Sequence, residues 1–256
     1  MTNPAPTHLY IVTGSSRGLG AALVAQLLQP GHTVLGMARR QNEGLQAQAD
    51  AADVPLTQWS VDLNEPIAPA ERLGRWLGGF ESARVASATL INNAGVVGLP
   101  APLGRVPLAE ISHAMRAGLE ATLLLTASFL AGTEAWTGPR RVLNISSGLG
   151  RRAMAGSATY CAAKAGMDHL SRALALEEAA QPNGARVVSM APGVIDTDMQ
   201  AQLRGADAAL FPEQARFAQL HAQGQLLSPA DCARQLLARL HRADFGQDVI
   251  ADIREA

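Results

Sequence analysis

The chain has 256 residues, 48% of them hydrophobic and 17% charged, which is ordinary for a globular protein. Its formal net charge of −1 favours neither a nucleic-acid partner nor an anionic membrane partner. Two cysteines are too few for a disulfide framework, so a cytoplasmic location is expected.

Short apolar segments alternate along the chain with longer helical patterns, as in repeated β-α-β units. We predict strands at residues 8–12, 33–37, 56–61, 89–91, 141–145, 186–190 and 248–251. The predicted helices cover residues 19–28, 43–51, 68–78, 108–130, 159–180 and 230–240. The apolar stretch at 119–132 is too short to span a bilayer and predicts a buried helix. We therefore expect one α/β domain over residues 1–256, with a single Rossmann-type doubly wound parallel sheet of about seven strands and helices on both faces.

A glycine-rich turn, TGSSRGLG over residues 13–20, follows the first predicted strand and precedes the first helix. Gly14 is able to adopt a turn conformation closed to other residues, and Gly18 lets the backbone approach a pyrophosphate. Gly20 allows the helix to pack closely on the strand. Because a helix N-terminus also offers free N–H groups to phosphates, this turn predicts a dinucleotide site.

The residues after the second and third strands bear on which dinucleotide binds. An NAD site is expected to carry an acidic residue after the second strand, and this chain has Arg39 and Arg40 there. Two guanidiniums suit the 2′-phosphate of NADP, and Arg17 in the glycine turn is expected to add a third positive charge at the same end. The pattern predicts NADP(H) as the cofactor. Asp62, after the third strand, has two open interpretations: an acceptor for the adenine amino group, or a cap for the next helix.

Three polar residues form the candidate catalytic group. Tyr160 and Lys164 are four residues apart in a predicted helix, so they share one face. Bringing the Tyr160 pKa from about 10 to near neutrality takes roughly three units, for which the Lys164 cation and an oxidised nicotinamide are the expected sources. Ser147 ends the fifth strand, where its hydroxyl is able to hold a carbonyl oxygen together with the Tyr160 phenol. Its neighbour Ser146 is expected to face away, because side chains alternate along a strand.

Together, these motifs resemble the short-chain dehydrogenase/reductase family, in the family's order and over roughly residues 8–200. The resemblance rests on the glycine turn, the NNAG segment at 92–95, Ser147, the Tyr160–Lys164 pair and Pro192-Gly193. In finer detail, residues 144–148, 189–202 and 224–229 resemble the bacterial benzil reductases, a branch similar to sepiapterin reductases. This resemblance implies an NADPH-dependent carbonyl reductase whose substrate is a small ketone or 1,2-diketone. A 3-oxoacyl or pteridine substrate is an alternative, as is an NADP(H)-sensing protein with weak catalysis.

By matching position, the resemblance implies a role for each site residue. Tyr160 is the general acid, Lys164 lowers its pKa and binds the nicotinamide ribose, and Ser147 orients the substrate carbonyl. The expected cofactor contacts are Gly14, Ser16, Arg17, Gly18, Leu19, Gly20, Arg39, Asp62, Asn93, Ala94, Gly95, Tyr160, Lys164, Pro192, Gly193, Val194 and Thr197. No metal site is expected, since the six histidines show no ligand spacing.

One position departs from the family pattern. Gly118 stands where many members carry a helix asparagine that anchors a water for proton relay. Its lack of a side chain predicts a slower or altered relay, and a kink or close packing in the helix. The resemblance also implies a homodimer or homotetramer formed through the fourth and fifth helices. Residues 199–225 are expected to form a mobile lid over the substrate.

Overall fold

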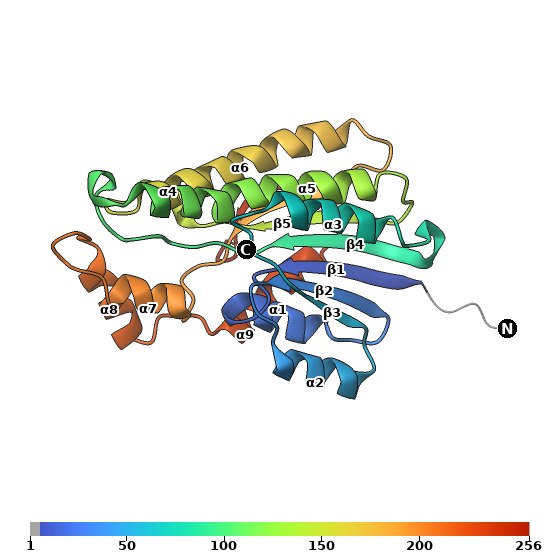
Figure 1. Cartoon of the computed structure of the whole chain (residues 1–256), viewed down its shortest axis with the longest axis horizontal. Coiled ribbons are helices and arrows are strands. Elements are labelled where there is room, and N and C mark those ends of the chain that lie inside the picture. The colour runs from blue at the N-terminus through green and yellow to red at the C-terminus, as the bar shows by residue number, and fades with distance from the viewer. Residues whose placement is uncertain (1–5, 256) are drawn as a thin grey trace.

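The computed structural model describes residues 6–255, which form a seven-stranded sheet with helices on both faces (Figure 1). The strands are parallel, and their order across the sheet is β3-β2-β1-β4-β5-β6-β7. They are β1 Thr7–Thr13, β2 His32–Ala38, β3 Leu56–Ser60, β4 Val85–Asn92, β5 Arg140–Ile145, β6 Arg186–Ala191 and β7 Ile250–Asp252. The helices are α1 Gly18–Leu27, α2 Glu43–Ala52, α3 Ile67–Leu77, α4 Leu108–Met115, α5 Ala121–Gly132, α6 Ala158–Ala179, α7 Asp198–Arg204, α8 Gln214–Ala222 and α9 Pro229–Leu240. The predicted α/β fold class is confirmed.

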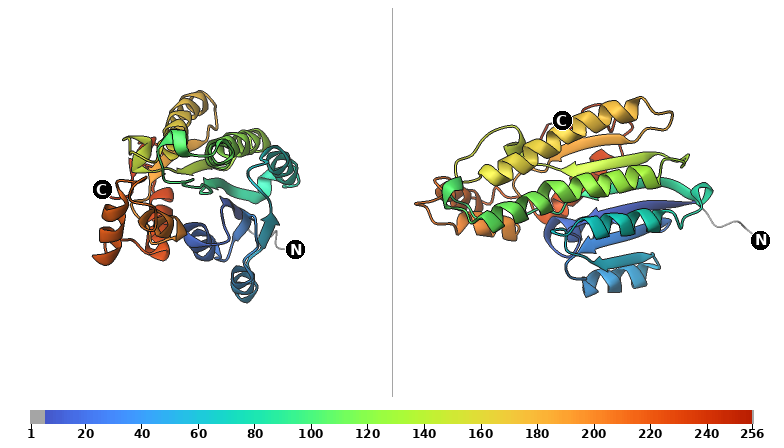
Figure 2. Two further views of the ribbon diagram at one scale, coloured as in Figure 1. Left: turned by 60° about the vertical axis from the view of Figure 1, so that its left-hand side comes forward. Right: turned by 45° about the horizontal axis from the view of Figure 1, so that its top comes forward.

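Alternating side chains of the central strand β1 build two separate cores. Tyr10 and Val12 pack with residues of α1 and α9 on one face of the sheet. Leu9 and Ile11 pack with residues of α3 and α5 on the other face. Both views in Figure 2 place α6 beside α5 on this second face. A strand buried on both faces explains the near-continuous apolar sequence of β1.

The helix predicted at 108–130 is interrupted in the structure. Helix α4 passes into a π-helical turn, Arg116–Glu120, before α5 begins. Gly118 lies in the middle of this turn, and a Cβ built there would lie 3.3 Å from the Ala163 Cβ on α6. Helices change direction at such π turns. The turn therefore brings the helix backbone close to α6, one residue before Lys164.

The whole helical stretch Leu108–Gly132 has 25 residues with a mean hydropathy of 1.2, enough by length and composition to cross a membrane. The sequence-based prediction concerned only the apolar stretch at 119–132, which is too short to span a bilayer; the complete helical stretch is long enough. In the structure, 44% of the apolar window is buried, and the stretch packs against α3 and α6. Core helices of globular proteins share this character, so the stretch is weak evidence for a membrane span.

Two helices that the sequence did not predict, α7 and α8, lie beyond the carboxyl ends of the strands (Figure 1). They fall within the expected lid at residues 199–225. Phe211, between them, is fully buried and stacks on Phe217 of α8 at 5.8 Å between ring centroids. The two rings form a small apolar core with Val97 and Tyr160, and this core holds the segment against the rest of the chain. The mobility of the lid stays a prediction.

Candidate active site

A cavity of about 870 Å³ opens at the carboxyl edge of the sheet. Its wall contains residues that follow each of the strands β1 to β6, which is where doubly wound sheets bind ligands. Every residue predicted for the site lines this one cavity. The structure thus brings the predicted catalytic and cofactor residues together.

The glycine turn between β1 and α1 has a backbone that only glycine adopts easily. Gly14 and Gly18 have φ angles of +68° and +54°, in the left-handed region. A Cβ built on Gly20 would lie only 2.1 Å from the Gly14 carbonyl oxygen. Any side chain at position 20 would therefore push α1 away from the turn. Close packing keeps the N-terminus of α1 facing the cavity, as a phosphate site requires.

Thr13 holds the glycine turn against the end of β4, a role that sequence reasoning missed. Its buried hydroxyl accepts the backbone N–H groups of Asn93 and Ala94, each at 2.9 Å. In return, the Asn93 amide donates to the Thr13 carbonyl oxygen at 2.9 Å. Asn93 therefore supports the central strands, and the motif spacing alone carried no signal for its threonine partner.

Two of the arginines predicted to face the cofactor have different surroundings. Arg17 pairs with Asp198 at the start of α7, and both side chains are largely exposed. Arg39 makes no ion pair within residues 6–255, which leaves its guanidinium open to an anionic ligand. Both arginines line the same cavity, so the expectation that Arg17 adds its charge beside Arg39 stays a prediction.

Asp62 is exposed on the cavity wall. Its Oδ1 accepts the Asn64 backbone N–H at 3.0 Å and the Asn64 amide at 2.7 Å. These bonds lower the pKa of the Asp62 carboxyl, and the charge of Arg39 adds to the effect. The helix-cap interpretation is wrong, because the residue before α3 is Pro66 and no side chain caps that helix. The adenine interpretation stays a prediction.

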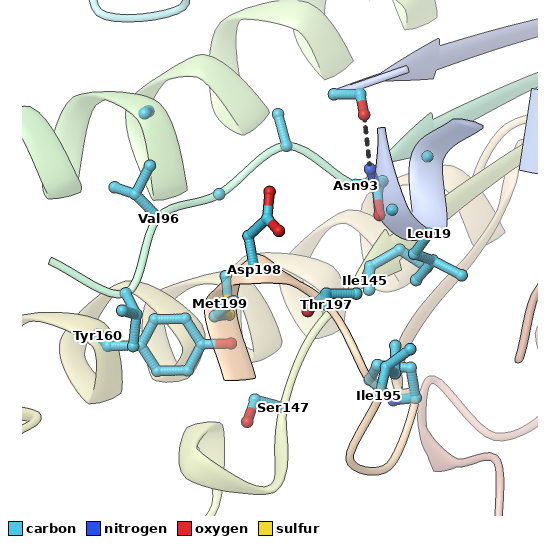
Figure 3. A pocket seen from close by; sticks show the side chains of 18 of the residues that line it. Leu19, Asn93, Val96, Ile145, Ser147, Tyr160, Ile195, Thr197, Asp198 and Met199 are labelled. Atoms are coloured by element: carbon cyan, nitrogen blue, oxygen red, sulfur yellow. Dashed lines mark hydrogen bonds between the residues drawn. The ribbon is translucent and has the colours of Figure 1, made fainter. Parts of the chain in front are cut away.

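Ser146 and Ser147 face opposite ways at the end of β5, as the alternation of side chains predicts. The Ser146 hydroxyl is buried and donates to Asp168 at 2.5 Å. Ser147 begins a short 3-10 turn, Gly148–Gly150, and its hydroxyl accepts the Leu149 N–H at 3.1 Å. In Figure 3 the Tyr160 phenol extends from α6 into the cavity, with Ser147 on the loop beside it. The serine and the phenol thus share one part of the cavity.

Burial raises the pKa of the Tyr160 phenol to about 12, although a hydrogen bond with Ser147 partly opposes the rise. The expected fall toward neutrality is therefore not produced by the protein's own groups. Desolvation of the phenolate outweighs the stabilisation that the hydroxyl of Ser147 provides. Without further positive charge, the phenol keeps its proton at neutral pH.

Lys164 is the only lysine in the chain; the other 20 residues of the Lys+Arg total of 21 are arginines. Its side chain is 4% exposed, and its ammonium donates to the Ile145 carbonyl oxygen at 2.6 Å. The ammonium lies 5.7 Å from the centroid of the Tyr160 ring. Burial lowers the pKa of Lys164 to about 8, and the charge of Asp168 opposes this fall. At neutral pH Lys164 is therefore mostly protonated and close to the phenol.

The cavity wall beyond Ser147 and Tyr160 is largely apolar. Val97, Leu203, Phe211 and Phe217 form a small core with partly buried residues that include Tyr160. Figure 3 shows Val96 on one wall of the cavity and Met199 at the start of the lid, and both of these apolar residues line the part of the cavity that contains the phenol. Thr197 precedes α7, and its methyl group would lie 3.4 Å from a Cβ on Gly18. Thr197 and Asp198, which lead into the lid, therefore lie against the cofactor turn, while the lid itself lines the substrate end of the cavity.

Comparisons with known proteins agree with this geometry. Residues 8–208 match the family model described as short chain dehydrogenase. The chain is 34% identical over 245 residues to a benzil reductase ((S)-benzoin forming) of Bacillus cereus, covering 96% of this chain and 98% of the relative. It is 33% identical over 258 residues to the sepiapterin reductase of Rattus norvegicus, covering 92% of each.

A solved structure from Agrobacterium tumefaciens, which holds bound NADP, superimposes with a TM-score of 0.78 at 25% identity. The superposition covers 96% of this chain and 94% of that one. NADP is also the cofactor that the sequence predicts here. The predicted resemblance to benzil and sepiapterin reductases is confirmed by the curated relatives. With a family model that matches most of its length, the chain belongs to the short-chain dehydrogenase/reductase family of oxidoreductases.

Proposed function

We propose that this chain is an NADPH-dependent carbonyl reductase that reduces a small ketone or 1,2-diketone, with Tyr160 as the general acid. One observation carries the proposal: a single cavity joins the glycine turn to Ser147, Tyr160 and Lys164. The apolar wall formed by the lid continues that cavity on the side of Tyr160.

The glycine turn, Arg39 and Thr197 fit a phosphorylated dinucleotide. Gly20 lets α1 pack closely against the Gly14 turn, which keeps the N-terminus of α1 at the cavity. Arg39 offers an unpaired guanidinium where the 2′-phosphate of NADP is expected. When bound, NADPH supplies the hydride for the carbonyl carbon.

Ser147 and Tyr160 act on the carbonyl oxygen. The Ser147 hydroxyl donates a hydrogen bond that orients and polarises the carbonyl. As the carbon gains the hydride, negative charge develops on the oxygen, which takes the proton from the Tyr160 O–H. A phenol with a pKa of about 12 holds its proton at neutral pH, and this state suits a proton donor.

Lys164 stabilises the phenolate that Tyr160 leaves behind. Its ammonium lies on the same face of α6 and is fixed by the Ile145 carbonyl. A cation at 5.7 Å from the ring centroid favours the phenolate once it has formed. Gly118 provides no side chain for a water relay to Lys164, so reprotonation is expected to use backbone groups or solvent. If Gly118→Asn leaves the pH dependence of the rate unchanged, that side chain has no part in the relay.

The substrate class follows from the wall around the phenol. Val97, Met199 and Phe217 offer apolar and aromatic contacts, which favour a hydrophobic ketone or diketone. Pteridine reduction is a second candidate, because the rat relative is a sepiapterin reductase.

The test follows NADPH absorbance with purified protein and aromatic 1,2-diketones, simple ketones, 3-oxoesters and pteridines. We expect the highest kcat/KM with a diketone and much slower turnover with NADH. A highest kcat/KM with a pteridine or a 3-oxoester would replace the proposed substrate class. Tight NADPH binding without turnover of any compound would favour the sensing protein.

Assembly and location complete the proposal. Leu123 on α5 is 41% exposed and Leu176 on α6 is 77% exposed, an apolar character compatible with a shared interface on these helices. We expect a cytoplasmic homodimer or homotetramer, which light scattering of the purified protein would reveal. A monomer at micromolar concentration would contradict the expected assembly.

A further inference from the structure

A buried carboxylate, Asp168, lies one helical turn after Lys164 on α6. It is 1% exposed, although nothing in the reaction uses it directly. Its Oδ1 accepts the hydroxyls of Ser146 at 2.5 Å and Ser189 at 2.6 Å. Its Oδ2 accepts the Nε–H of Arg151 at 3.3 Å. A carboxylate that receives three donors, one of them cationic, is well suited to carry a negative charge.

Each donor ties Asp168 to a different part of the active site. Ser146 immediately precedes Ser147, so the bond fixes the end of β5 that presents the Ser147 hydroxyl. Ser189 belongs to β6, which leads into Pro192 and the nicotinamide side of the cavity. A carboxylate at this position therefore joins α6, β5 and β6 beneath the reacting groups.

The loop that carries Ser147 is shaped around the same carboxylate. A Cβ on Gly150 would lie 2.7 Å from the Asp168 Oδ2 and 2.9 Å from the Lys164 carbonyl oxygen. Only glycine lets the loop approach α6 so closely at this point. Arg151, the next residue, also donates to the Ala251 carbonyl oxygen at 2.7 Å, which anchors the loop to β7.

The charged and titratable groups around Lys164 come from three elements. Tyr160 and Asp168 lie on α6 itself, on either side of Lys164 along one helix face. Arg151 approaches from the loop after β5 and reaches Lys164 only through Asp168. Asp252 of β7 lies beyond Arg151, and its charge is held mainly by Arg254. The Lys164 ammonium itself contacts the Ile145 carbonyl oxygen and makes no direct ion pair within residues 6–255. Asp168, buried like Lys164 and four positions further along the same face of α6, is the carboxylate whose charge lies one helical turn away.

We propose that Asp168 is a positioning residue for the reaction: its carboxylate aligns the Ser147 loop with α6 and provides the counter-charge for Lys164. The proposal deepens the proposed function, because Lys164 acts there as the cation beside Tyr160. Burial alone disfavours a protonated lysine, and the opposing effect of Asp168 on the Lys164 pKa agrees with this role.

The chain offers an unusually direct test, since Lys164 is its only lysine. Protein labelled with ¹³Cε-lysine gives one lysine resonance, whose pH titration reports Lys164 without cofactor or substrate. In Asp168→Asn the side-chain oxygen still accepts from both serines, whereas the charge is gone. We expect the titration midpoint to fall by about one unit or more. We also expect kcat for ketone reduction to decline at correspondingly lower pH, with a smaller change in KM.

Arg151→Gln provides a variant with the opposite sign. It removes the cation that competes for Asp168, so the Lys164 midpoint is expected to rise. Ser189→Ala removes one hydrogen bond but keeps the charge, and should leave the midpoint in place. Asp50→Asn is the matched control, because this exposed carboxylate on α2 bonds only Gln46. If Asp168→Asn fails to fold, the Arg151→Gln shift still decides the question.

If the Lys164 midpoint is unchanged in Asp168→Asn, the counter-charge role is overturned. If Asp168→Asn does not fold, an unchanged midpoint in Arg151→Gln overturns it. Equal losses of activity in Asp168→Asn and Ser189→Ala, without any shift in midpoint, would reduce Asp168 to a packing element. Because the titration needs no turnover, a protein inactive toward every ketone would refute the proposed function while leaving this test intact.

Discussion

Two clusters of buried and half-buried charge, one around Lys164 at the carboxyl end of the sheet and one around Arg141 at its amino end, differ in how they are compensated. At the carboxyl end, Lys164 and the buried Asp168 lie one helical turn apart on α6, and Asp168 pairs with Arg151. At the amino end, Arg141 has no acidic partner within residues 6–255, and its buried Nε has no hydrogen-bond partner. The carboxyl end therefore keeps its charges by compensating them, as a site for proton transfer must.

In the cluster around Arg141, the surroundings instead favour the neutral form of the histidines. Tyr10 bonds His241 at 3.0 Å, and His8 bonds Ser87 at 2.8 Å. Burial first, and then neighbouring cations that include Arg141, lower the pKa of His8 and of His241. A cluster of cationic groups without a carboxylate is stable only while its histidines stay uncharged. We therefore expect the ionisable residues of the cluster around Arg141 to contribute to packing and not to the chemistry.

The two tyrosines of the chain, Tyr160 and Tyr10, provide the strongest test of this contrast. Tyr160→Phe removes the proton donor, and we expect kcat to fall by about 10²- to 10⁴-fold. Tyr10→Phe should retain kcat and lose about 1 kcal/mol of stability with its bond to His241. Steady-state kinetics and urea unfolding measure the two effects. Similar losses of kcat in both variants would contradict the assignment of chemistry to one end.

Two unpaired arginines, one at each end, give a second matched pair. Arg39→Ala is expected to raise the KM for NADPH by about 10- to 100-fold, because a charge-assisted hydrogen bond is worth roughly 1.5–3 kcal/mol. The KM for NADH should change little. Arg141→Met should leave both KM values as they are. Unchanged discrimination between the two cofactors in Arg39→Ala would show that the 2′-phosphate is held elsewhere.

The smallest effect concerns acid stability at the amino end. The folded pKa values of His8 and His241 lie below the unfolded value of about 6.5, so the unfolded chain binds more protons in the acidic range. Their contribution is complete above about pH 6.5 and is lost as the pH falls below that value. Urea midpoints at pH 7.5, 6.5 and 5.5 should therefore decrease in that order.

Arg141→Met should make the urea midpoint fall less with pH, because the substitution removes a cation that helps to lower the pKa of both His8 and His241. Arg75→Met is the control, since this exposed residue on α3 pairs only with Glu71. The carboxyls with lowered pKa values, such as Asp62 and Asp252, lose their stabilising effect only below about pH 4. Equal acid sensitivity in the wild-type and Arg141→Met proteins would show that Arg141 makes no contribution to it and that burial and the neighbouring histidines lower the histidine pKa values.

Much of the site could be predicted from the sequence because its motifs are local. The turn at 13–20 needs glycine because of its own backbone conformation, which involves only eight residues. Tyr160 and Lys164 share a helix face because they are about one helical turn apart. The parallel fold then places every such motif at one edge of the sheet. The strand and helix order followed from apolar periodicity alone, except for α7 and α8, whose short segments lie in a region without a clear period.

The tertiary structure decided two things: which distant segments are in contact, and how far burial opposes the charged forms of the ionisable groups. Three contacts join residues that are between 21 and 181 positions apart in the sequence, and no spacing rule predicts them. They are Thr13 with Asn93, Arg17 with Asp198, and Asp168 with Ser189. The rise of the Tyr160 pKa depends on how fully the fold removes its hydroxyl from water. By itself, the sequence determined which groups reach the cavity. Only the packed structure decided their partners and protonation, because desolvation and long-range contacts exist only once the chain has folded.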